Sequence, residues 1–399
     1  MKKKIAIVGG GACALILGTE LNTKKYEVSV FEKNKALGRK FLVAGYGGLN
    51  ITHSEDNKDF ISRYNPQNFI EPYLLHFNNQ RLIQWLNKHH VPTYKGSSGR
   101  VFPKKELKAI AVLNTLQQAM LSNGAQLFFN HEWLGFDEAG SLTFKTHKNV
   151  SSLRFDKVIF CLGGASWPVT GSDGAWTKHY EQKHIKIEPF LPSNCAFGIA
   201  WPTSLLEKIE GKALKNCLVS MLEKSRAGEL VFTKFGVEGS GIYPFSWEIR
   251  EELNTQGYAT IHLDFKPNVR LETLITKIND SKLKGSYTQK IKSILNLNEL
   301  QLHLLKTYLT KEEFLDIYCL CRKIKSFELR IIKLASIDEA ISTVGGVALN
   351  EINEHFELKK LPNHFAIGEM LDYDAPTGGY LLQSCFSMAK YLADYLNEE

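Results

Sequence analysis

Apolar positions recur with different periods in different parts of this 399-residue chain. KIAIV (residues 4–8) and YEVSVFEK (26–33) are nearly continuous apolar runs, separated by GGGACALILGTEL. Short continuous runs of this kind predict strands of a parallel sheet that is buried on both faces. DKVIFCLGGAS (156–166) repeats the signal, and AQLFFNHEWLGF (125–136) is expected to form one further strand. The helical spacing of apolar residues over 106–122 predicts an amphipathic helix that covers the sheet.

The middle of the chain has a different pattern. From about residue 189, short alternating runs such as NCLVSMLE, GELVFT and YATIHLDF predict antiparallel strands. The period becomes helical over 269–330, and STVGGV (342–347) returns to a strand pattern. The chain is therefore expected to leave a first domain, form an insert and return.

The turn after the first apolar run carries a nucleotide-binding pattern. Gly9, Gly11 and Ala14 occupy the three positions of a G-x-G-x-x-G/A fingerprint between a predicted strand and a predicted helix. The first glycine permits a tight turn, the second lets the backbone approach a pyrophosphate, and the small third residue lets the helix pack close to the sheet. Glu32 ends the second strand, 21 residues after Gly11. A carboxylate there accepts hydrogen bonds from ribose hydroxyls and repels a 2′-phosphate, which favours FAD or NAD over NADP.

The C-terminal segment distinguishes FAD from NAD. LPNHFAIGEMLDYDAPTGGYLLQSCFSMAKYLADYL (361–396) predicts a strand, a glycine turn, an acidic loop, a Gly-Gly pair and an amphipathic helix. In two-part flavoproteins such a segment places an acid near the ribitol and aims a helix N-terminus at the flavin ring. Reduced flavin is anionic at its N1 and O2 edge, and a helix N-terminus at Gly378–Tyr380 would stabilise that charge. An NAD dehydrogenase has no need of this segment, so FAD is the expected cofactor.

These patterns predict an α/β fold with a discontinuous Rossmann-like FAD-binding domain, an inserted antiparallel β-barrel-like domain and a small helical subdomain. We expect the FAD-binding domain to comprise residues 1–188 and 342–399, the β insert 189–268 and 331–341, and the helical subdomain 269–330.

Composition indicates the class of protein and the cellular compartment. The 44% apolar and 23% charged fractions are ordinary for a globular protein, and no stretch approaches the roughly 20 apolar residues that span a bilayer. The first residues lack the apolar core of a signal peptide. Seven cysteines form no C-x-x-C motif, so we expect a reducing, cytoplasmic setting with no membrane contact, no dithiol redox centre and no metal site.

GRKFLVAGYGGLNITH (38–53) contains four glycines and an Arg–Lys pair. Glycine costs about 1 kcal/mol relative to alanine in a helix, so this stretch is expected to form neither a good helix nor a good strand. A bare backbone is costly unless something must approach it closely. We therefore expect the stretch to lie against a ligand.

The chain resembles the YhiN/BaiN-type bacterial flavoproteins, also called the aminoacetone oxidase family of NAD(P)/FAD-dependent oxidoreductases. The likeness spans nearly the whole length and rests on the fingerprint, GRKFLVAGYGGLNITHSE (38–55), GRVFP (99–103), WPVTGSDGAW (167–176), GELVFTKFGVEGSGIY (228–243), STVGGV and GEMLDYDAPTGGYLLQ. Many members read GGGRCN where this chain has GYGGLN, as in a GGLN-containing subfamily. Gly48 and Leu49 replace the Arg-Cys pair, so chemistry that depends on that cysteine is not carried over.

The resemblance implies a set of FAD contacts. Arg39 and Lys40 would line the adenosine and pyrophosphate, residues 45–48 would lie along the isoalloxazine, and Trp133 would lie near the adenine. With the fingerprint and the C-terminal segment, the expected cofactor contacts are Gly9, Gly11, Ala12, Cys13, Ala14, Glu32, Lys33, Gly38, Arg39, Lys40, Gly45, Gly47, Gly48, Asn50, Trp133, Gly163, Gly164, Gly368, Glu369, Asp372, Gly378, Gly379 and Tyr380.

The expected activity is that of an FAD-dependent oxidoreductase. Only one dinucleotide fingerprint is present, so NAD(P)H is expected as a transient electron donor without a domain of its own. Three classes of acceptor stay open: a uridine of ribosomal RNA, a small metabolite or amine with O₂, and an unsaturated carbonyl compound. A flavin-binding protein without catalysis, working with an RNA or protein partner, is a further alternative.

Charge and catalytic residues leave two questions open. Residues 269–330 contain twelve Lys and Arg against seven Asp and Glu, an excess of five in a chain of net charge +7. This excess is typical either of a solvated helical face or of a basic surface for ribosomal RNA. No catalytic residue is assigned from a motif. His53, Tyr46, Tyr380 and Glu369 lie near the expected flavin by motif position, and each is also compatible with a structural role.

Overall fold

The computed structural model describes residues 2–45, 48–281 and 285–399, which divide into two compact units. The first unit comprises Met1–Ser193 and Ile337–Glu399, and the second unit comprises Asn194–Ser336. The chain therefore leaves the first unit once and returns to it once, as an inserted unit requires.

A parallel sheet forms the centre of the first unit. Its five strands run in the order β20-β10-β1-β2-β6, and each pairs in parallel with its neighbours. Ile5–Val8 of β1 are at most 2% exposed, which is the two-sided burial that the continuous apolar run predicts. The Rossmann-like α/β fold is confirmed. The strand bounds are β1 (Lys3–Val8), β2 (Tyr26–Glu32), β6 (Gln126–Phe129), β10 (Lys157–Phe160) and β20 (His364–Ala366).

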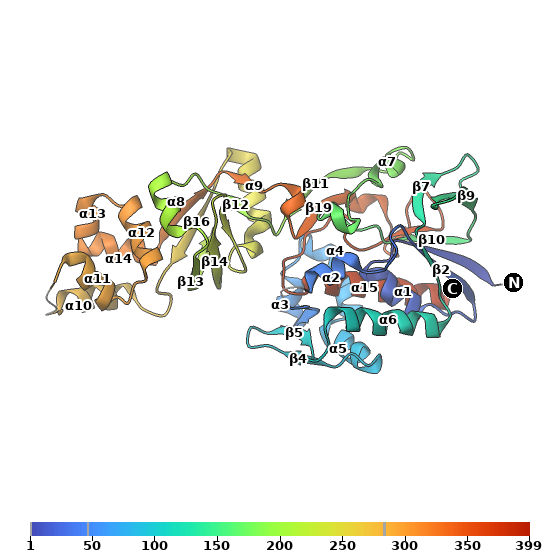
Figure 1. Ribbon diagram of the computed structural model, residues 1–399, viewed down its shortest axis with the longest axis horizontal. Coiled ribbons are helices and arrows are strands. Elements are labelled where there is room, and N and C mark those ends of the chain that lie inside the picture. Colours follow the sequence, from blue (N-terminus) through green and yellow to red (C-terminus); the bar gives the residue numbers. More distant parts are fainter. Residues whose placement is uncertain (1, 46–47, 282–284) are drawn as a thin grey trace. The chain divides into compact units, whose positions relative to one another are not determined.

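Two layers cover this sheet (Figure 1). On one side α1 (Ala12–Glu20) packs against both α6 (Ala109–Asn123) and α15 (Tyr380–Glu398). A Cβ on Gly18 would lie 2.7 Å from the Met120 side chain, so glycine allows the close approach of α1 and α6. The other layer is a three-stranded antiparallel sheet of β7 (Glu132–Phe136), β8 (Leu142–Lys145) and β9 (Val150–Leu153). Its Phe144 ring stacks 4.3 Å from the ring of Phe31 on β2.

Two smaller sheets and several short helices complete the first unit. The sheet β3-β5-β4 consists of β3 (Thr52–His53), β5 (Arg100–Pro103) and β4 (Thr93–Lys95). β11 (Ile187–Ser193) pairs in antiparallel fashion with β19 (Ser342–Val347). Because these two strands pair with each other, residues 189–193, expected in the insert, belong to the first unit. The helices are α2 (Arg39–Ala44), α3 (Asn57–Ile61), α4 (Gln67–His76), α5 (Asn79–Lys88) and α7 (Thr177–Glu181).

Two local predictions are wrong. The single strand expected over 125–136 is two strands of different sheets, because Asn130 adopts a left-handed conformation (φ 56°) between β6 and β7. The glycine-rich stretch contains a helix, α2, since its glycines lie at the helix ends rather than inside it. Gly38, at φ 62°, is the N-cap residue and Gly45 is the C-cap residue.

The second unit contains a seven-stranded antiparallel sheet in the order β17-β16-β13-β14-β15-β12-β18. The two edge strands, β17 and β18, are separated in sequence by Ile332 alone, so the sheet curls back on itself as a barrel does. The strands are β12 (Phe197–Gly198), β13 (Ala213–Met221), β14 (Lys224–Phe232), β15 (Gly236–Glu238), β16 (Ala259–Asp264), β17 (Phe327–Ile331) and β18 (Lys333–Leu334).

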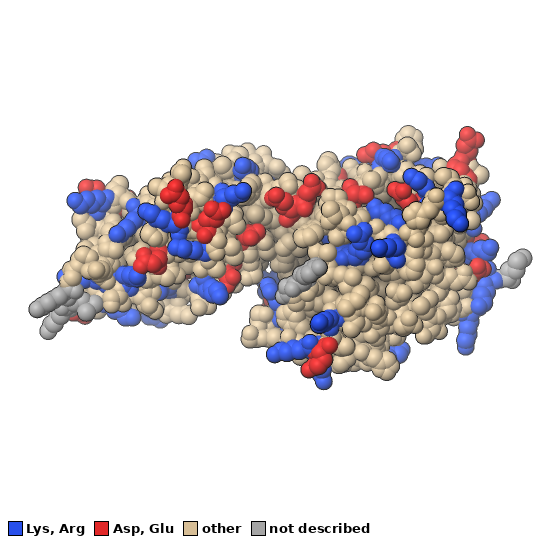
Figure 2. All heavy atoms as spheres, in the orientation of Figure 1, with Lys and Arg blue, Asp and Glu red and all other residues tan. Residues whose placement is uncertain are grey.

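Seven helices accompany this sheet in the described part of the second unit. They are α8 (Thr203–Ile209), α9 (Ser246–Gln256), α10 (Leu271–Asn279), α11 (Tyr287–Ile294), α12 (Glu299–Tyr308), α13 (Lys311–Leu315) and α14 (Ile317–Lys325). In the view of Figure 2, basic and acidic side chains are interspersed over α10–α14. Across 2–45, 48–281 and 285–399, no helix is long and apolar enough to cross a membrane.

Candidate cofactor site

A cavity of about 480 Å³ opens at the carboxyl ends of β1, β2 and β10 in the first unit. This is the edge of a parallel α/β sheet at which nucleotides bind. Most of the predicted cofactor contacts line the cavity, although they come from segments far apart in the sequence. They are Gly9, Gly11, Ala12, Cys13, Glu32, Lys33, Gly38, Arg39, Lys40, Asn50, Trp133, Gly163, Gly368, Glu369, Gly378 and Gly379.

Six other predicted contacts do not line this cavity, and the structure gives several of them packing roles. Gly45 lies against Ala109, Gly164 against Thr343, and Gly48 against the Phe102 ring. Ala14 is fully buried, Asp372 accepts a hydrogen bond from the Gly345 amide, and the Tyr380 hydroxyl donates to Glu55. Gly47, like Tyr46, lies outside the described residues. As cofactor contacts these residues stay predictions.

The fingerprint turn leaves space for a ligand. Gly9 has a φ of +103°, and a Cβ there would lie 2.4 Å from the carbonyl oxygen of Cys161, so only glycine fits against the residue that follows β10. Gly11 differs, because a Cβ there would have the Cys161 carbonyl oxygen as its nearest neighbour, at 4.0 Å. A side chain at Gly11 would therefore enter the cavity. The N-terminus of α1 follows directly, without a side-chain cap or an acidic residue in its first turn. This arrangement suits a diphosphate group.

Glu32 organises the neighbouring wall of the cavity. Its Oε2 atom accepts a hydrogen bond from the Gly10 amide at 2.9 Å. Its Oε1 atom accepts two hydrogen bonds at 2.8 Å, from the amide and the side-chain amide of Asn34. A carboxylate offers about four acceptor positions, so Oε2 retains capacity for a ligand hydroxyl. Glu32 can thus bind a ribose while it holds the fingerprint turn.

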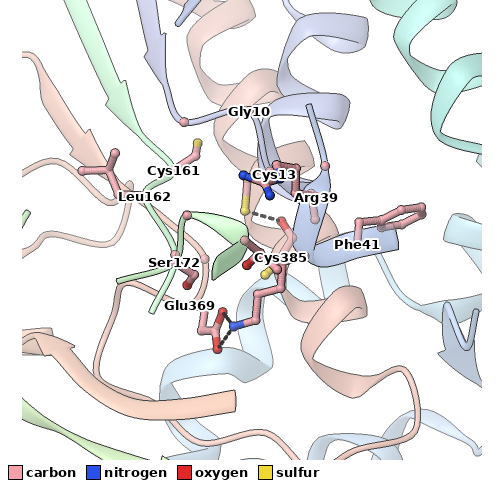
Figure 3. A pocket seen from close by; sticks show the side chains of 18 of the residues that line it. Gly10, Cys13, Arg39, Phe41, Cys161, Leu162, Ser172, Glu369 and Cys385 are labelled. Carbon is pink, nitrogen blue, oxygen red and sulfur yellow. Dashed lines mark hydrogen bonds and ion pairs between the residues drawn. The ribbon is translucent and has the colours of Figure 1, made fainter. Parts of the chain in front are cut away.

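Lys40, which is expected to line the adenosine and pyrophosphate, forms an ion pair within the protein. Its Nζ atom lies 2.8 and 2.7 Å from the two carboxylate oxygens of Glu369 and donates to the Ser166 hydroxyl at 2.7 Å. The Glu369 side chain is only 8% exposed, and both residues line the cavity, where Figure 3 labels Glu369. Lys40 therefore lies with Glu369, on the side of the cavity where the sequence predicts the flavin.

The loop at residues 170–173 was not predicted to contact a cofactor, although it belongs to the quoted WPVTGSDGAW motif. Thr170, Ser172 and Asp173 line the cavity. The Asp173 carboxylate pairs with Lys33 at 2.8 Å and so joins this loop to the end of β2. Burial raises the pKa of Asp173, but the Lys33 ammonium and the Ala175 amide outweigh it, and the net pKa is lowered. Lys33 and Asp173 are 140 positions apart in sequence, so no local sequence pattern could have predicted this contact.

Three cysteines from three segments also line the cavity (Figure 3). The Cys13 thiol donates to the carbonyl oxygen of Cys385 at 3.5 Å. Contact with Cys161, together with burial, raises the pKa of Cys13 well above its ordinary value, and contact with Cys13 does the same for Cys385. These two thiols are therefore protonated at neutral pH and are poor nucleophiles. None of the seven cysteines forms a disulfide, and no metal-binding group of three or more His, Cys, Asp or Glu occurs among the described residues.

His53 and Tyr380 belong to a hydrogen-bonded cluster beside the start of α15. The Tyr380 hydroxyl donates to Glu55 Oε2 at 2.8 Å, and Arg63 forms a two-point ion pair with the same carboxylate. His53 accepts a hydrogen bond from the Glu55 amide at Nδ1 and contacts the Ser98 carbonyl oxygen at 2.9 Å through Nε2. These contacts assign the proton to Nε2. Both nitrogens of His53 are thus used within the protein.

An unsatisfied side-chain atom lies on the cavity wall. The Oδ1 atom of Asn50 is buried and has no hydrogen-bond partner among residues 2–45, 48–281 and 285–399. At the same wall, Gly378 and Gly379 precede α15, which has no side-chain cap and no acidic residue in its first turn. A buried orphan acceptor and an uncapped helix N-terminus are features that a bound flavin would satisfy. The residues present therefore fit FAD.

Comparison with known proteins identifies relatives over nearly the whole chain. The family described as HI0933-like protein Rossmann domain matches residues 3–395. A ribosomal RNA dihydrouridine synthase of Haemophilus influenzae is 23% identical over 394 residues, which cover 96% of each chain. One of Escherichia coli is 23% identical over 405 residues, which cover 96% of this chain and 95% of the relative.

A relative with a different substrate has similar coverage. The 3-dehydro-bile acid delta(4,6)-reductase of Clostridium scindens is 22% identical over 409 residues, 98% of each chain. Among solved structures, the 3-ketosteroid delta1-dehydrogenase of Sterolibacterium denitrificans matches over the full length of both chains with a TM-score of 0.54 and 12% identity. At that identity, the match to the solved structure shows a shared fold.

Proposed function

The chain belongs to the HI0933-like Rossmann-domain family and is an FAD-dependent oxidoreductase, and on that premise we propose that it uses NAD(P)H to reduce a uridine of ribosomal RNA. The bond reduced is a carbon–carbon double bond conjugated to a carbonyl group. The observation that carries the proposal is the pairing of a fingerprint-lined cavity with two ribosomal RNA dihydrouridine synthases as full-length relatives.

The reactions for which these relatives are named share one chemistry. Dihydrouridine forms when the C5–C6 double bond of uracil, conjugated to the C4 carbonyl, is reduced. A delta(4,6)-reductase of a 3-dehydro bile acid acts on double bonds conjugated to a C3 ketone. Both reactions add a hydride and a proton to an electron-poor double bond. This common chemistry supports a conjugated carbonyl acceptor for the present chain.

The residues that would hold FAD follow from the cavity. FAD, when bound, supplies a two-electron carrier. Gly9–Cys13 and the N-terminus of α1 would hold its diphosphate, Glu32 its ribose, and Gly378–Gly379 with the N-terminus of α15 the N1 and O2 edge of its ring. Because the chain has one fingerprint, NAD(P)H would bind only transiently.

An excess of basic residues in the second unit supports RNA as the acceptor. The excess of Lys and Arg over residues 269–330 falls mainly on α10–α14 and the segments between them. Several of these cations are tied to acids, including Lys292 to Glu299 and Lys325 to Asp264. Others, such as Arg270 and Lys277, have no ion pair among the described residues and are available to phosphates.

The test compares dihydrouridine in ribosomal RNA from a strain lacking the gene, from its parent and from the complemented strain. We expect one dihydrouridine site to disappear on deletion and to return with the intact gene. The purified protein should be yellow and should release non-covalent FAD on denaturation. Identical nucleosides in all strains would exclude the uridine. Colourless protein that does not bind added FAD would contradict the cofactor assignment.

A small unsaturated carbonyl compound is the second candidate acceptor, favoured by the bile acid reductase among the full-length relatives. In that case, a 3-oxo-Δ4 steroid should oxidise the reduced holoenzyme under anaerobic conditions, while ribosomal RNA from the deletion strain should not. The two acceptors are therefore separated by a single reoxidation experiment.

A further inference from the structure

Arg100 is the second residue of the GRVFP motif, and it is not among the residues that line the cavity described above. It is the first residue of β5 and pairs across the sheet with His53 of β3. Arg100 and Phe102 are two residues apart, so their side chains leave the same face of the strand. That face contacts two segments expected at the flavin. The Phe102 ring lies 3.5 Å from where a Cβ of Gly48 would be, and Arg100 Nε lies 3.7 Å from where a Cβ of Gly378 would be.

The guanidinium of Arg100 has no partner in the described part of the chain. Arg100 is half-buried, and neither a hydrogen bond nor an ion pair involves its side chain there. Glu55, the acid of the adjacent cluster with Arg63 and Tyr380, already has other partners. Both oxygens of Glu55 are taken by Arg63, and one of them also accepts from Tyr380. Arg100 therefore keeps an uncompensated positive charge.

The surroundings of Arg100 favour a negative ligand atom. Gly378 and Gly379 lead into α15, whose first turn has no acidic residue and no side-chain cap. The partial positive charge of that helix N-terminus adds to the charge of Arg100. A guanidinium presents five donors in a rigid plane and suits an oxyanion or a polarised carbonyl oxygen. A half-buried arginine without a protein partner at this position has its donors available to a ligand.

We propose that Arg100 binds the carbonyl oxygen of the acceptor and stabilises the negative charge that develops there during reduction; this rests on the function proposed above. In that reduction, NAD(P)H is the ultimate source of the hydride, which adds to the carbon remote from the carbonyl. The π electrons of the double bond move toward the carbonyl oxygen, and a proton from water then adds to the carbon next to the carbonyl. A donor already aimed at the oxygen lowers the barrier.

The experiment uses FAD-loaded protein and two variants, Arg100→Ala and Arg100→Lys. Arg154→Ala, which removes an exposed arginine from the same unit, is the matched control. The first measurement titrates the oxidised holoenzyme with 4-nitrophenolate, a stable mimic of the enolate oxygen. The second follows anaerobic reoxidation of the reduced holoenzyme by a 3-oxo-Δ4 steroid and by ribosomal RNA from the deletion strain. FAD content and the rate of reduction by NADPH are recorded for every protein.

We expect Arg100→Ala to weaken 4-nitrophenolate binding and to slow reoxidation, each at least about tenfold, because hydrogen bonds to charged groups contribute that much. FAD content and reduction by NADPH should match those of the parent. Arg100→Lys should give values between those of the parent and Arg100→Ala, since it keeps the positive charge and loses the planar set of guanidinium donors. Added guanidinium should partly restore reoxidation in Arg100→Ala and leave the control unchanged.

Two failures are distinguishable. If neither the steroid nor the RNA reoxidises the reduced parent holoenzyme, the proposed function fails. The titration with 4-nitrophenolate still shows whether Arg100 binds an anionic oxygen. If the parent binds no 4-nitrophenolate, or if Arg100→Ala and Arg100→Lys bind it and reoxidise like the parent, the role of Arg100 is wrong. If Arg100→Ala does not fold, Arg100→Lys decides the outcome by the same two measurements.

Discussion

Glu32 has two roles: it holds the fingerprint turn in place, and it can bind a ribose hydroxyl. Its carboxylate holds the Gly10 amide and the Asn34 side chain, and Oε2 remains able to accept from a ribose. Replacing Glu32 with Ala therefore removes a ligand contact and loosens the wall that shapes the cavity. Hydrogen bonds to a charged group contribute roughly 1.5–3 kcal/mol, so we expect the Kd for FAD to rise at least about tenfold.

The measurement is a titration of apoprotein with FAD, followed by flavin fluorescence. Glu27→Ala is the matched control, because Glu27 lies on the same strand and is exposed. We expect the control to bind FAD like the parent and both variants to keep the parent's circular dichroism. An unchanged Kd for Glu32→Ala would show that the fingerprint has been misread.

Single residues also show which features of the site the sequence could predict and which it could not. Gly9 and Glu32 were predictable because a local pattern of strand, turn and helix fixes their positions. The pairing of Lys40 with Glu369 was not, since 329 residues separate the two and no periodicity links them. The orphan Oδ1 of Asn50 likewise depends on packing from several segments. Long-range contacts of this kind require the fold.

At the scale of elements, single backbone conformations explain the two local predictions that were wrong. Glycines at Gly38 and Gly45 bracket α2 instead of breaking it, because a helix tolerates glycine at its caps. Asn130 divides the strand expected over 125–136 because it adopts a positive φ, which asparagine permits at low cost. Periodicity thus located the strands and helices well, while their ends depended on single backbone conformations.

The cluster of Glu55, Arg63 and Tyr380 joins the segment after β3 to the start of α15. Burial raises the pKa of Glu55, but hydrogen bonds from Arg63 and Tyr380 outweigh it, so the folded-state pKa lies below the ordinary value of 4.5. A carboxylate with a lowered folded-state pKa contributes stability above its unfolded pKa. That contribution is lost as the pH falls through the folded-state pKa.

We therefore expect Glu55→Gln to unfold at lower urea concentration than the parent at pH 7. The difference should stay constant down to about pH 5 and then shrink as the carboxylate of the parent is protonated. Glu71→Gln, which removes an exposed carboxylate from α4, serves as the control. A difference that persists unchanged well below pH 4.5 would mean that Glu55 acts through packing and not through its charge.

At the scale of the whole molecule, the two units divide the chemistry between them. The cavity and all of its lining residues belong to the first unit, and the excess of basic residues belongs to the second. Composition predicted that excess, but it could not show that Lys292 and Lys325 are paired with acids. Such pairs reduce the charge available to a polyanion. An RNA contact in the second unit therefore depends on the remaining cations.

The last prediction tests a group of lysines of the second unit that includes the paired Lys292. Changing Lys282, Lys284, Lys290 and Lys292 to Ala should weaken binding of ribosomal RNA fragments and flatten its salt dependence, because each lost phosphate contact lowers the slope of log K against log[salt] by about 0.7–0.9. Lys282 and Lys284 lie outside the described residues, and Lys292 pairs with Glu299, so Lys290→Ala alone is a useful second variant. FAD content should not change, since the four lysines belong to the second unit and the cavity to the first.

The matched control changes four exposed lysines of the first unit to Ala, Lys24, Lys58, Lys88 and Lys148. It removes the same net charge, so a general electrostatic effect would appear equally in both proteins. If both variants lose affinity alike, RNA is attracted by net charge and the second unit holds no specific contact. A parent protein without salt-sensitive affinity for ribosomal RNA would exclude RNA as the acceptor. The conjugated carbonyl of a small molecule would then be the substrate that Arg100 is placed to bind.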